Sequence, residues 1–118
     1  MSELVQVETS ERDGIVVARV TGELDLAGAE PIGDELAAAV PTSALGLIVD
    51  FRELSFIDSS GVAMLFSLAR RLASRRQQLR CVTPSDSPVA RVLEIVEFER
   101  AAPIDSDLDQ ALAGIAES

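Results

Sequence analysis

The residues best placed to do chemistry are Asp58, Ser59, Ser60 and Gly61, which lie between a short apolar stretch and a long helical pattern. Asp58 or Ser59 stands where a helix N-cap belongs, because the first backbone amides of a helix lack internal partners and donate to short oxygen-bearing side chains. A phosphate on Ser59 would carry about −1.5 to −2 charges, which the positive end of a helix tolerates. The segment therefore predicts a serine that another protein could phosphorylate without unfolding the helix.

Two other interpretations of Ser59 start from the same residues. As a nucleophile it would need the G-x-S-x-G turn of hydrolases, but Ile57 occupies the place of the first glycine. The sequence contains no histidine, and the carboxylate of Asp58 is too weak a base to activate a serine alone. We therefore expect a protein that is not an enzyme and has no catalytic residue. The second alternative is that Ser59 only helps to begin the helix, as Ser and Asp commonly do.

The same helix carries two further groups that could contact a partner. Projected at about 100° per residue, Met64 falls opposite Val62, Phe66 and Ala69, so we expect it to be exposed near Ser59. A flexible apolar side chain there would suit a partner interface. Basic residues gather at the far end of the pattern: Arg70, Arg71, Arg75 and Arg76. They are expected to form a solvated face that complements the helix dipole, or alternatively a contact for an acidic partner.

The composition limits the classes of partner. The chain has 118 residues, a formal net charge of −10 and an aromatic content of 3%. Nucleic acid and anionic membrane surfaces would be repelled, and few aromatic rings are available to stack on bases. No apolar run approaches the roughly 20 residues that span a bilayer, and the chain begins without the pattern of a secretory leader. We expect a cytoplasmic protein that needs no metal or cofactor, with its one cysteine, Cys81, as a small buried hydrophobe.

Apolar periodicity and turn residues predict the elements that position Ser59. Strands are expected near residues 4–8, 15–20, 47–49, 78–83 and 101–104, the second closing at Asp25. Helices are expected from near Gly28 with Pro31 in its first turn, from Asp58 or Ser59, behind Ser87-Pro88, and behind a capping box of Ser106 and Asp109.

This order of elements predicts an α/β fold with a single-layer, mostly parallel sheet, in one domain over residues 1–118. The sheet should have about four to five strands with an antiparallel edge strand, because the first two strands are joined by a short turn, and four helices should accompany it. Ligands and partners of such sheets meet the carboxyl ends of the strands. Asp25 and Ser59 are both expected there.

Three segments together resemble the STAS family, in particular its bacterial anti-sigma factor antagonists. The segments are Gly22-Glu23-Leu24-Asp25, Asp50-Phe51 and Leu54-Ser55-Phe56-Ile57-Asp58-Ser59-Ser60-Gly61, and the likeness extends from about Val7 to about Leu112. The chain departs from the family at Val62-Ala63, where a second glycine is frequent, and at Val96-Glu97-Phe98, which replaces a turn that commonly contains glycine.

The resemblance implies a partner-switching function. Ser59 would be phosphorylated by a cognate anti-sigma factor that is also an ATP-dependent serine kinase, and a metal-dependent serine phosphatase would reverse the reaction. The unphosphorylated chain would bind that kinase and release a sigma factor. Asp25 and Asp58 would flank the acceptor, while Ser60 and Gly61 would complete the helix start. The alternative within the family is a scaffold or accessory subunit of a transport or signalling assembly, without a phosphorylation switch.

Overall fold

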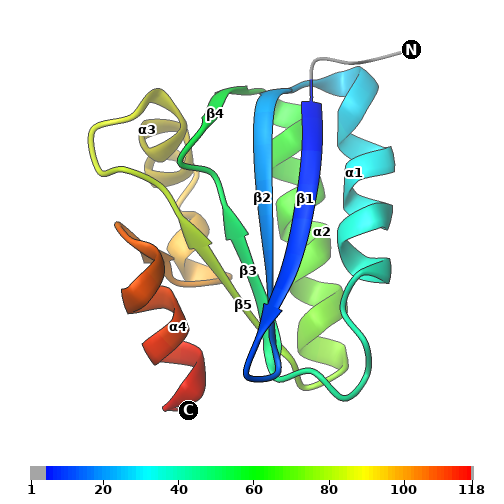
Figure 1. Cartoon of the computed structure of the whole chain (residues 1–118). Helices are drawn as coiled ribbons and strands as arrows, with labels where there is room; N and C mark the ends of the chain where they lie inside the picture. Colours follow the sequence, from blue (N-terminus) through cyan, green and yellow to red (C-terminus); the bar gives the residue numbers. More distant parts are fainter. Residues whose placement is uncertain (1–4, 118) are drawn as a thin grey trace.

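The computed structural model describes residues 5–117 and consists of one mixed sheet covered by helices on both faces (Figure 1). The strands are β1 (Val5–Arg12), β2 (Ile15–Leu24), β3 (Gly46–Asp50), β4 (Leu54–Ile57), β5 (Gln78–Val82) and β6 (Ile104–Asp105). The helices are α1 (Leu26–Ala38), α2 (Ser59–Ser74), α3 (Pro88–Ile95) and α4 (Leu108–Ala116), with a 3₁₀ turn, η1 (Phe98–Arg100). The predicted fold class, the antiparallel edge and the four helices are confirmed, but within residues 5–117 the sheet has six strands instead of four to five.

Strands β1 and β2 form the antiparallel hairpin at the edge of the sheet, and the remaining pairs are parallel. The hairpin turns at Asp13 and Gly14, which both have positive φ, 53° and 83°. This backbone matches the twist of the two strands and suits Asp followed by Gly. Strand β1 runs on to Arg12, beyond its expected end near residue 8, while Leu4 lies outside the described residues.

The strand that the sequence did not predict is β4. It is only four residues long, and Ser55 and Phe56 within it are exposed, so it lacks a clear alternating pattern. Strand β2 pairs with β3 along its first half and with β4 at its end, with a register shift between Gly22 and Glu23. The Ser55 hydroxyl donates to the Gly22 carbonyl at 2.9 Å and fixes this irregular pairing. Strand β4 thus carries the chain directly to the start of α2.

The sheet separates two hydrophobic cores of unequal size. Helices α1, α2 and α3 contribute to the larger core, and α4 covers part of the opposite face with Ala111 and Ile115. Alternate residues of β2 face each core, as the period of two in a strand requires: Val16 and Ala18 lie in the larger one, Ile15 and Val17 in the smaller. Helices α1 and α2 lie side by side on the same face of the sheet (Figure 1). The candidate site lies at the upper end of this pair.

Two predicted helix starts were displaced. Helix α1 begins at Leu26 rather than near Gly28, because the Asp25 side chain caps it, and Pro31 lies inside the helix instead of in its first turn. Pro31 and Ala27 are both exposed, so water can solvate the Ala27 carbonyl that a proline cannot bond. Helix α4 is capped by Asp107, which accepts from the Gln110 amide at 2.8 Å, and not by Ser106.

Candidate functional site

Two aspartates begin the two neighbouring helices at the carboxyl edge of the sheet. Asp25 Oδ1 accepts from the amides of Ala27 at 3.1 Å and Gly28 at 3.3 Å. Asp58 Oδ1 accepts from the amides of Ser60 at 2.9 Å and Gly61 at 3.1 Å. Leu24 pairs with Ile57, and the Asp58 amide donates to the Leu24 carbonyl at 3.2 Å, so the two aspartates follow adjacent strand ends. Both helix N-termini therefore lie side by side at this edge, each with a carboxylate on it.

Ser59 is the first residue of α2 and its side chain is exposed. Asp58 takes the N-cap position that the sequence left open between these two residues, so the serine is not the cap. Within residues 5–117 the Ser59 hydroxyl makes no hydrogen bond, whereas the hydroxyls of Ser55 and Ser74 donate to backbone carbonyls. The Ser59 hydroxyl is thus exposed and not hydrogen-bonded within residues 5–117, and it lies at the positive end of a helix. Such an oxygen is accessible to a phosphoryl donor.

Gly61 allows the first turn of α2 to lie directly on the strand ends. A Cβ at this position would come within 2.7 Å of Ile57 Cγ1 and 3.0 Å of the Leu24 carbonyl oxygen. The second of these contacts is with backbone, which cannot move aside as the end of a side chain can. Gly61 is therefore needed for the close contact between α2 and the strand ends, and it is buried there. Ser60, the residue before it, is half-buried.

The predicted exposure of Met64 is wrong. Met64 is only 8% exposed, because α2 is covered on two sides: by the sheet, through Leu65 and Leu72, and by α1. A Cβ on Gly33 of α1 would lie 2.6 Å from Met64 Cγ, so the absence of a side chain at Gly33 makes room for the methionine. The helical projection assumed a single buried stripe and could not show the second covering element.

Met64 instead forms part of the floor of a groove between α1 and α2, with a volume of about 440 Å³. The groove begins at Leu26 and Ser60, next to Ser59, and runs along the helices toward Asp34 and Arg71. These last two side chains form an ion pair at 3.4 Å across the groove. Sequence reasoning missed this feature, since it depends on how two helices distant in the chain are placed.

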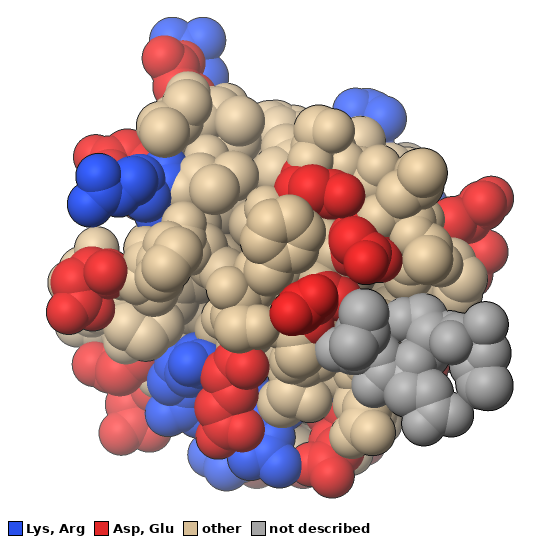
Figure 2. Space-filling model, turned by 90° about the horizontal axis from the view of Figure 1, so that it is seen from above, with Lys and Arg blue, Asp and Glu red and all other residues tan. Residues whose placement is uncertain are grey.

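Exposed apolar side chains flank the aspartates and the serine. Leu26, directly after Asp25, is 77% exposed, and Phe56, three residues before Ser59, is 46% exposed. Figure 2 looks down on this edge of the sheet and shows acidic side chains grouped together next to a broad uncharged area. A surface of this kind, with apolar side chains near a modifiable hydroxyl, can bind another protein.

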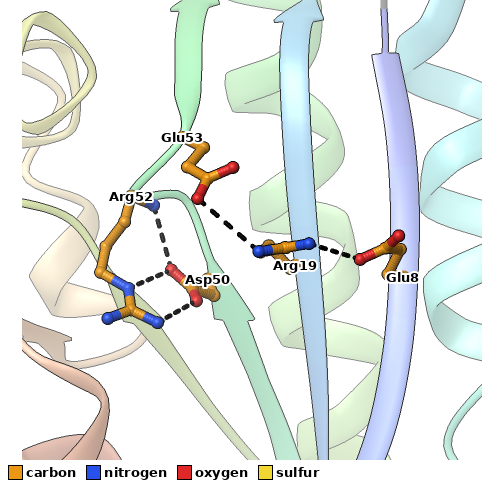
Figure 3. Close-up of polar contacts among 5 residues, drawn as sticks. All are labelled: Glu8, Arg19, Asp50, Arg52 and Glu53. Atoms are coloured by element: carbon orange, nitrogen blue, oxygen red, sulfur yellow. Dashed lines mark hydrogen bonds and ion pairs between the residues drawn. The ribbon is translucent and has the colours of Figure 1, made fainter.

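A charged network supports the loop that leads from β3 into β4 (Figure 3). Asp50 is 2% exposed at the end of β3, and its two oxygens accept from Arg52 Nε at 2.9 Å and Arg52 Nη2 at 2.7 Å, and from the Arg52 amide at 3.0 Å. These bonds raise the pKa of the Arg52 guanidinium. Beside them, Arg19 lies between Glu8 and Glu53. The network holds the path of the chain toward Ser59.

The remaining candidates have structural surroundings. Cys81 is fully buried in β5, as expected, and burial first, then the negative charge of Asp105, raises the pKa of its thiol to about 12. All four arginines near the end of α2 are exposed, as expected of a solvated face. Arg75 also donates to the carbonyls of Val40 at 3.3 Å and Ala37 at 3.4 Å. Arg75 and, through its ion pair with Asp34, Arg71 thus tie α2 to α1, and a contact with an acidic partner stays a prediction.

Neither a membrane-spanning helix nor a metal-binding cluster is present among residues 5–117. None of the helices in this range has both the length and the apolar character that crossing a membrane requires. Among residues 5–117, no three Asp, Glu or Cys side chains are grouped so that they could hold a metal ion.

Comparisons with known proteins point to one family. The family model of the STAS domain matches residues 6–111. BtrV of Bordetella bronchiseptica, a protein named as an anti-sigma factor antagonist, is 30% identical over 102 residues, which are 86% of each chain.

Solved structures agree with this match. The structure of an anti-sigma factor antagonist from Mycobacterium paratuberculosis superposes with a TM-score of 0.84 at 22% identity, covering 95% of this chain and 94% of that one. The Bacillus cell fate determinant SpoIIAA in its phosphorylated form has a TM-score of 0.69 at 26% identity, covering 93% of this chain and 99% of that one. The first of these likenesses shows the fold, and the second adds a relative that carries a phosphate.

Proposed function

Because the chain belongs to the STAS domain family, and its relatives are anti-sigma factor antagonists, we propose that it binds a cognate anti-sigma factor and so releases a sigma factor. In this proposal the partner is also an ATP-dependent serine kinase that phosphorylates Ser59, and a serine phosphatase restores the chain. The protein itself is a binder in the cytoplasm and not an enzyme. The observation that carries the proposal is the exposed, unbonded hydroxyl of Ser59 at the start of α2.

The switch follows from the charges that phosphoryl transfer brings together. Transfer from ATP requires the γ-phosphate to lie against Ser59 Oγ, so the product complex has phosphoserine next to the phosphates of ADP. At about 6 Å and an effective dielectric constant near 20, each pair of unit charges costs about 3 kcal/mol. A loss of about 2.7 kcal/mol already weakens binding a hundredfold. One phosphate on an exposed residue can therefore release the partner.

The same surface supplies the contacts of the unphosphorylated state. Leu26 and Phe56 are exposed on either side of the aspartates and offer apolar area that a partner can cover. Asp25 and Asp58 are held in place by their N-cap hydrogen bonds, so their free oxygens face a partner without further ordering. The binding surface is thus preorganised, and a phosphate changes its charge but not its shape.

The test compares two variants of equal size in a binding titration with the cognate anti-sigma factor kinase. Ser59→Asp introduces a charge, and Ser59→Asn is its neutral control. We expect Ser59→Asp to weaken binding at least tenfold relative to Ser59→Asn, with both variants folded. Equal affinities would contradict a charge-operated switch and favour the alternative within the family, a scaffold in which Ser59 only begins the helix.

A further inference from the structure

The groove between α1 and α2 is continuous with the Ser59 surface but extends well beyond it. Its lining runs from Ser60 to Arg71 along α2, and eleven residues of α-helix span about 17 Å. Ala63 and Met64 lie within about 8 Å of Ser59 along the helix, but the end of the groove at Arg71 is separated from it by more than the Debye length of about 8 to 10 Å, so a phosphate on Ser59 acts on that end only weakly. A partner bound there makes contacts that are independent of the switch.

The floor of the groove is apolar and its geometry is fixed by small residues. Ala29 and Gly33 of α1 face Met64 and Leu68 of α2, and Met64 fits only because Gly33 has no side chain. Ala63 lines the groove and is exposed, so the space above it is open to solvent. At about 440 Å³ the groove is within the range of sites that bury ligands, and it can accept apolar side chains from a partner.

The rim of the groove is acidic. Glu30 and Asp34 line it on the α1 side, and the one arginine in the lining, Arg71, pairs with Asp34, so the charge of Glu30 is left uncompensated within the lining. The carboxylates of Asp25 and Asp58 lie at its upper end, beside Leu26 and Ser60. A second copy of this chain, with its net charge of −10, would be repelled from such a rim. A segment with apolar and basic side chains complements the groove, because its apolar side chains match the floor and its basic side chains match the rim.

We propose that this groove receives a basic amphipathic segment of the anti-sigma factor, whose apolar side chains fill the floor over Met64 while its Lys or Arg side chains face Glu30 and the carboxylates of Asp25 and Asp58 at the upper end. This inference rests on the proposed function, since it names a segment of that partner. The bound segment would give the partner a second contact area. This contact orients the partner so that its nucleotide lies next to Ser59. Contact with the acidic rim also accelerates association, with a dependence on salt concentration.

Two pairs of matched variants test the groove by titration with the cognate anti-sigma factor kinase. Ala63→Arg fills the groove and adds positive charge, and Ala73→Arg makes the same change at an exposed alanine of α2 outside the groove lining. Glu30→Lys reverses the charge of the rim, and Glu35→Lys does the same at an exposed position of α1 outside it. We expect each groove variant to raise Kd at least tenfold and each control to change it less than twofold.

A spectroscopic measurement keeps the test valid if a variant folds poorly. In the wild-type chain, the amide signals of Gly33 and Ala63 are expected to shift when the anti-sigma factor binds. Unshifted signals, or equal affinities of Ala63→Arg and Ala73→Arg, would overturn the groove proposal even while Ser59→Asp weakens binding. Failure of the wild-type chain to bind any anti-sigma factor would instead overturn the proposed function and, with it, this inference. A dimer that Ala63→Arg dissociates would show that a second copy occupies the groove.

Discussion

A negative charge at position 59 should change the free energy of unfolding only slightly. The size of this change follows from Coulomb's law and from the exposure of Ser59. Ser59 is exposed, so a charge there interacts through water-like surroundings with the carboxylates of Asp58 and Asp25 on the adjacent strand ends. At about 6 Å and a dielectric constant near 80, each of these pairs costs about 0.7 kcal/mol. The positive end of α2 returns about 0.3 to 1 kcal/mol. Ser59→Asp should therefore be less stable than Ser59→Asn by about 0.5 to 1 kcal/mol.

The assay is urea unfolding of both variants at low salt and at 0.5 M NaCl, read by circular dichroism. The difference between Ser59→Asp and Ser59→Asn should shrink at high salt, because exposed charges are screened. Phosphorylated protein should behave like Ser59→Asp with about twice the effect. A loss of more than about 3 kcal/mol in Ser59→Asp would refute the reasoning, because it would show that the side chain is enclosed in the native state.

Three further outcomes follow from particular contacts. Asp50→Ala removes the acceptor of three hydrogen bonds from Arg52, and since Arg52 can turn to solvent, the free energy of unfolding should fall by about 1 to 3 kcal/mol in a denaturant titration; an unchanged midpoint would contradict this role. Gly61→Ala should destabilise the protein by about 1 to 3 kcal/mol, opposite in sign to helix propensity, because its Cβ meets the Leu24 carbonyl; higher thermal stability would contradict the close approach. The Cys81 thiol has its pKa raised from 9.0 to about 12 in the folded protein, so the unfolded chain loses its proton first, and stability should fall by up to about 1.4 kcal/mol per pH unit above pH 9. Cys81→Ala should lack this part of the slope, and an equal slope in both proteins would show that the thiol is not responsible.

Local signals in the sequence were sufficient where neighbouring residues decide the structure. The hairpin turn depends on the positive φ of Asp13 and Gly14, and the caps at Asp58 and Ser87 depend on side chains within three residues of the amides they bond. The burial of Cys81 followed from its place in an apolar strand. For the same reason the predicted start of a helix at Asp58 or Ser59 agrees with the structure.

Features that depend on distant segments could not be predicted. Strand β4 exists because Leu54, Phe56 and Ile57 pair with the end of β2, 32 or 33 residues earlier in the chain. Met64 is buried because Gly33 of α1 approaches it, and the groove above it has the same origin. The ion pairs of Arg19 connect β2 with Glu8 of β1 and with Glu53 in the loop before β4. In each case tertiary packing, which leaves no local pattern, decided the outcome.

The measurement that tests the central claim most directly is phosphate mapping by mass spectrometry after incubation with the cognate anti-sigma factor kinase and ATP. We expect one phosphate per chain, on the peptide that contains Ser59, and none on the Ser59→Ala variant. Ser60 is the internal comparison, because it is the next residue but half-buried. Phosphate on Ser60 or elsewhere in the Ser59→Ala variant, or a wild-type chain that stays unmodified while it binds the kinase, would contradict the account.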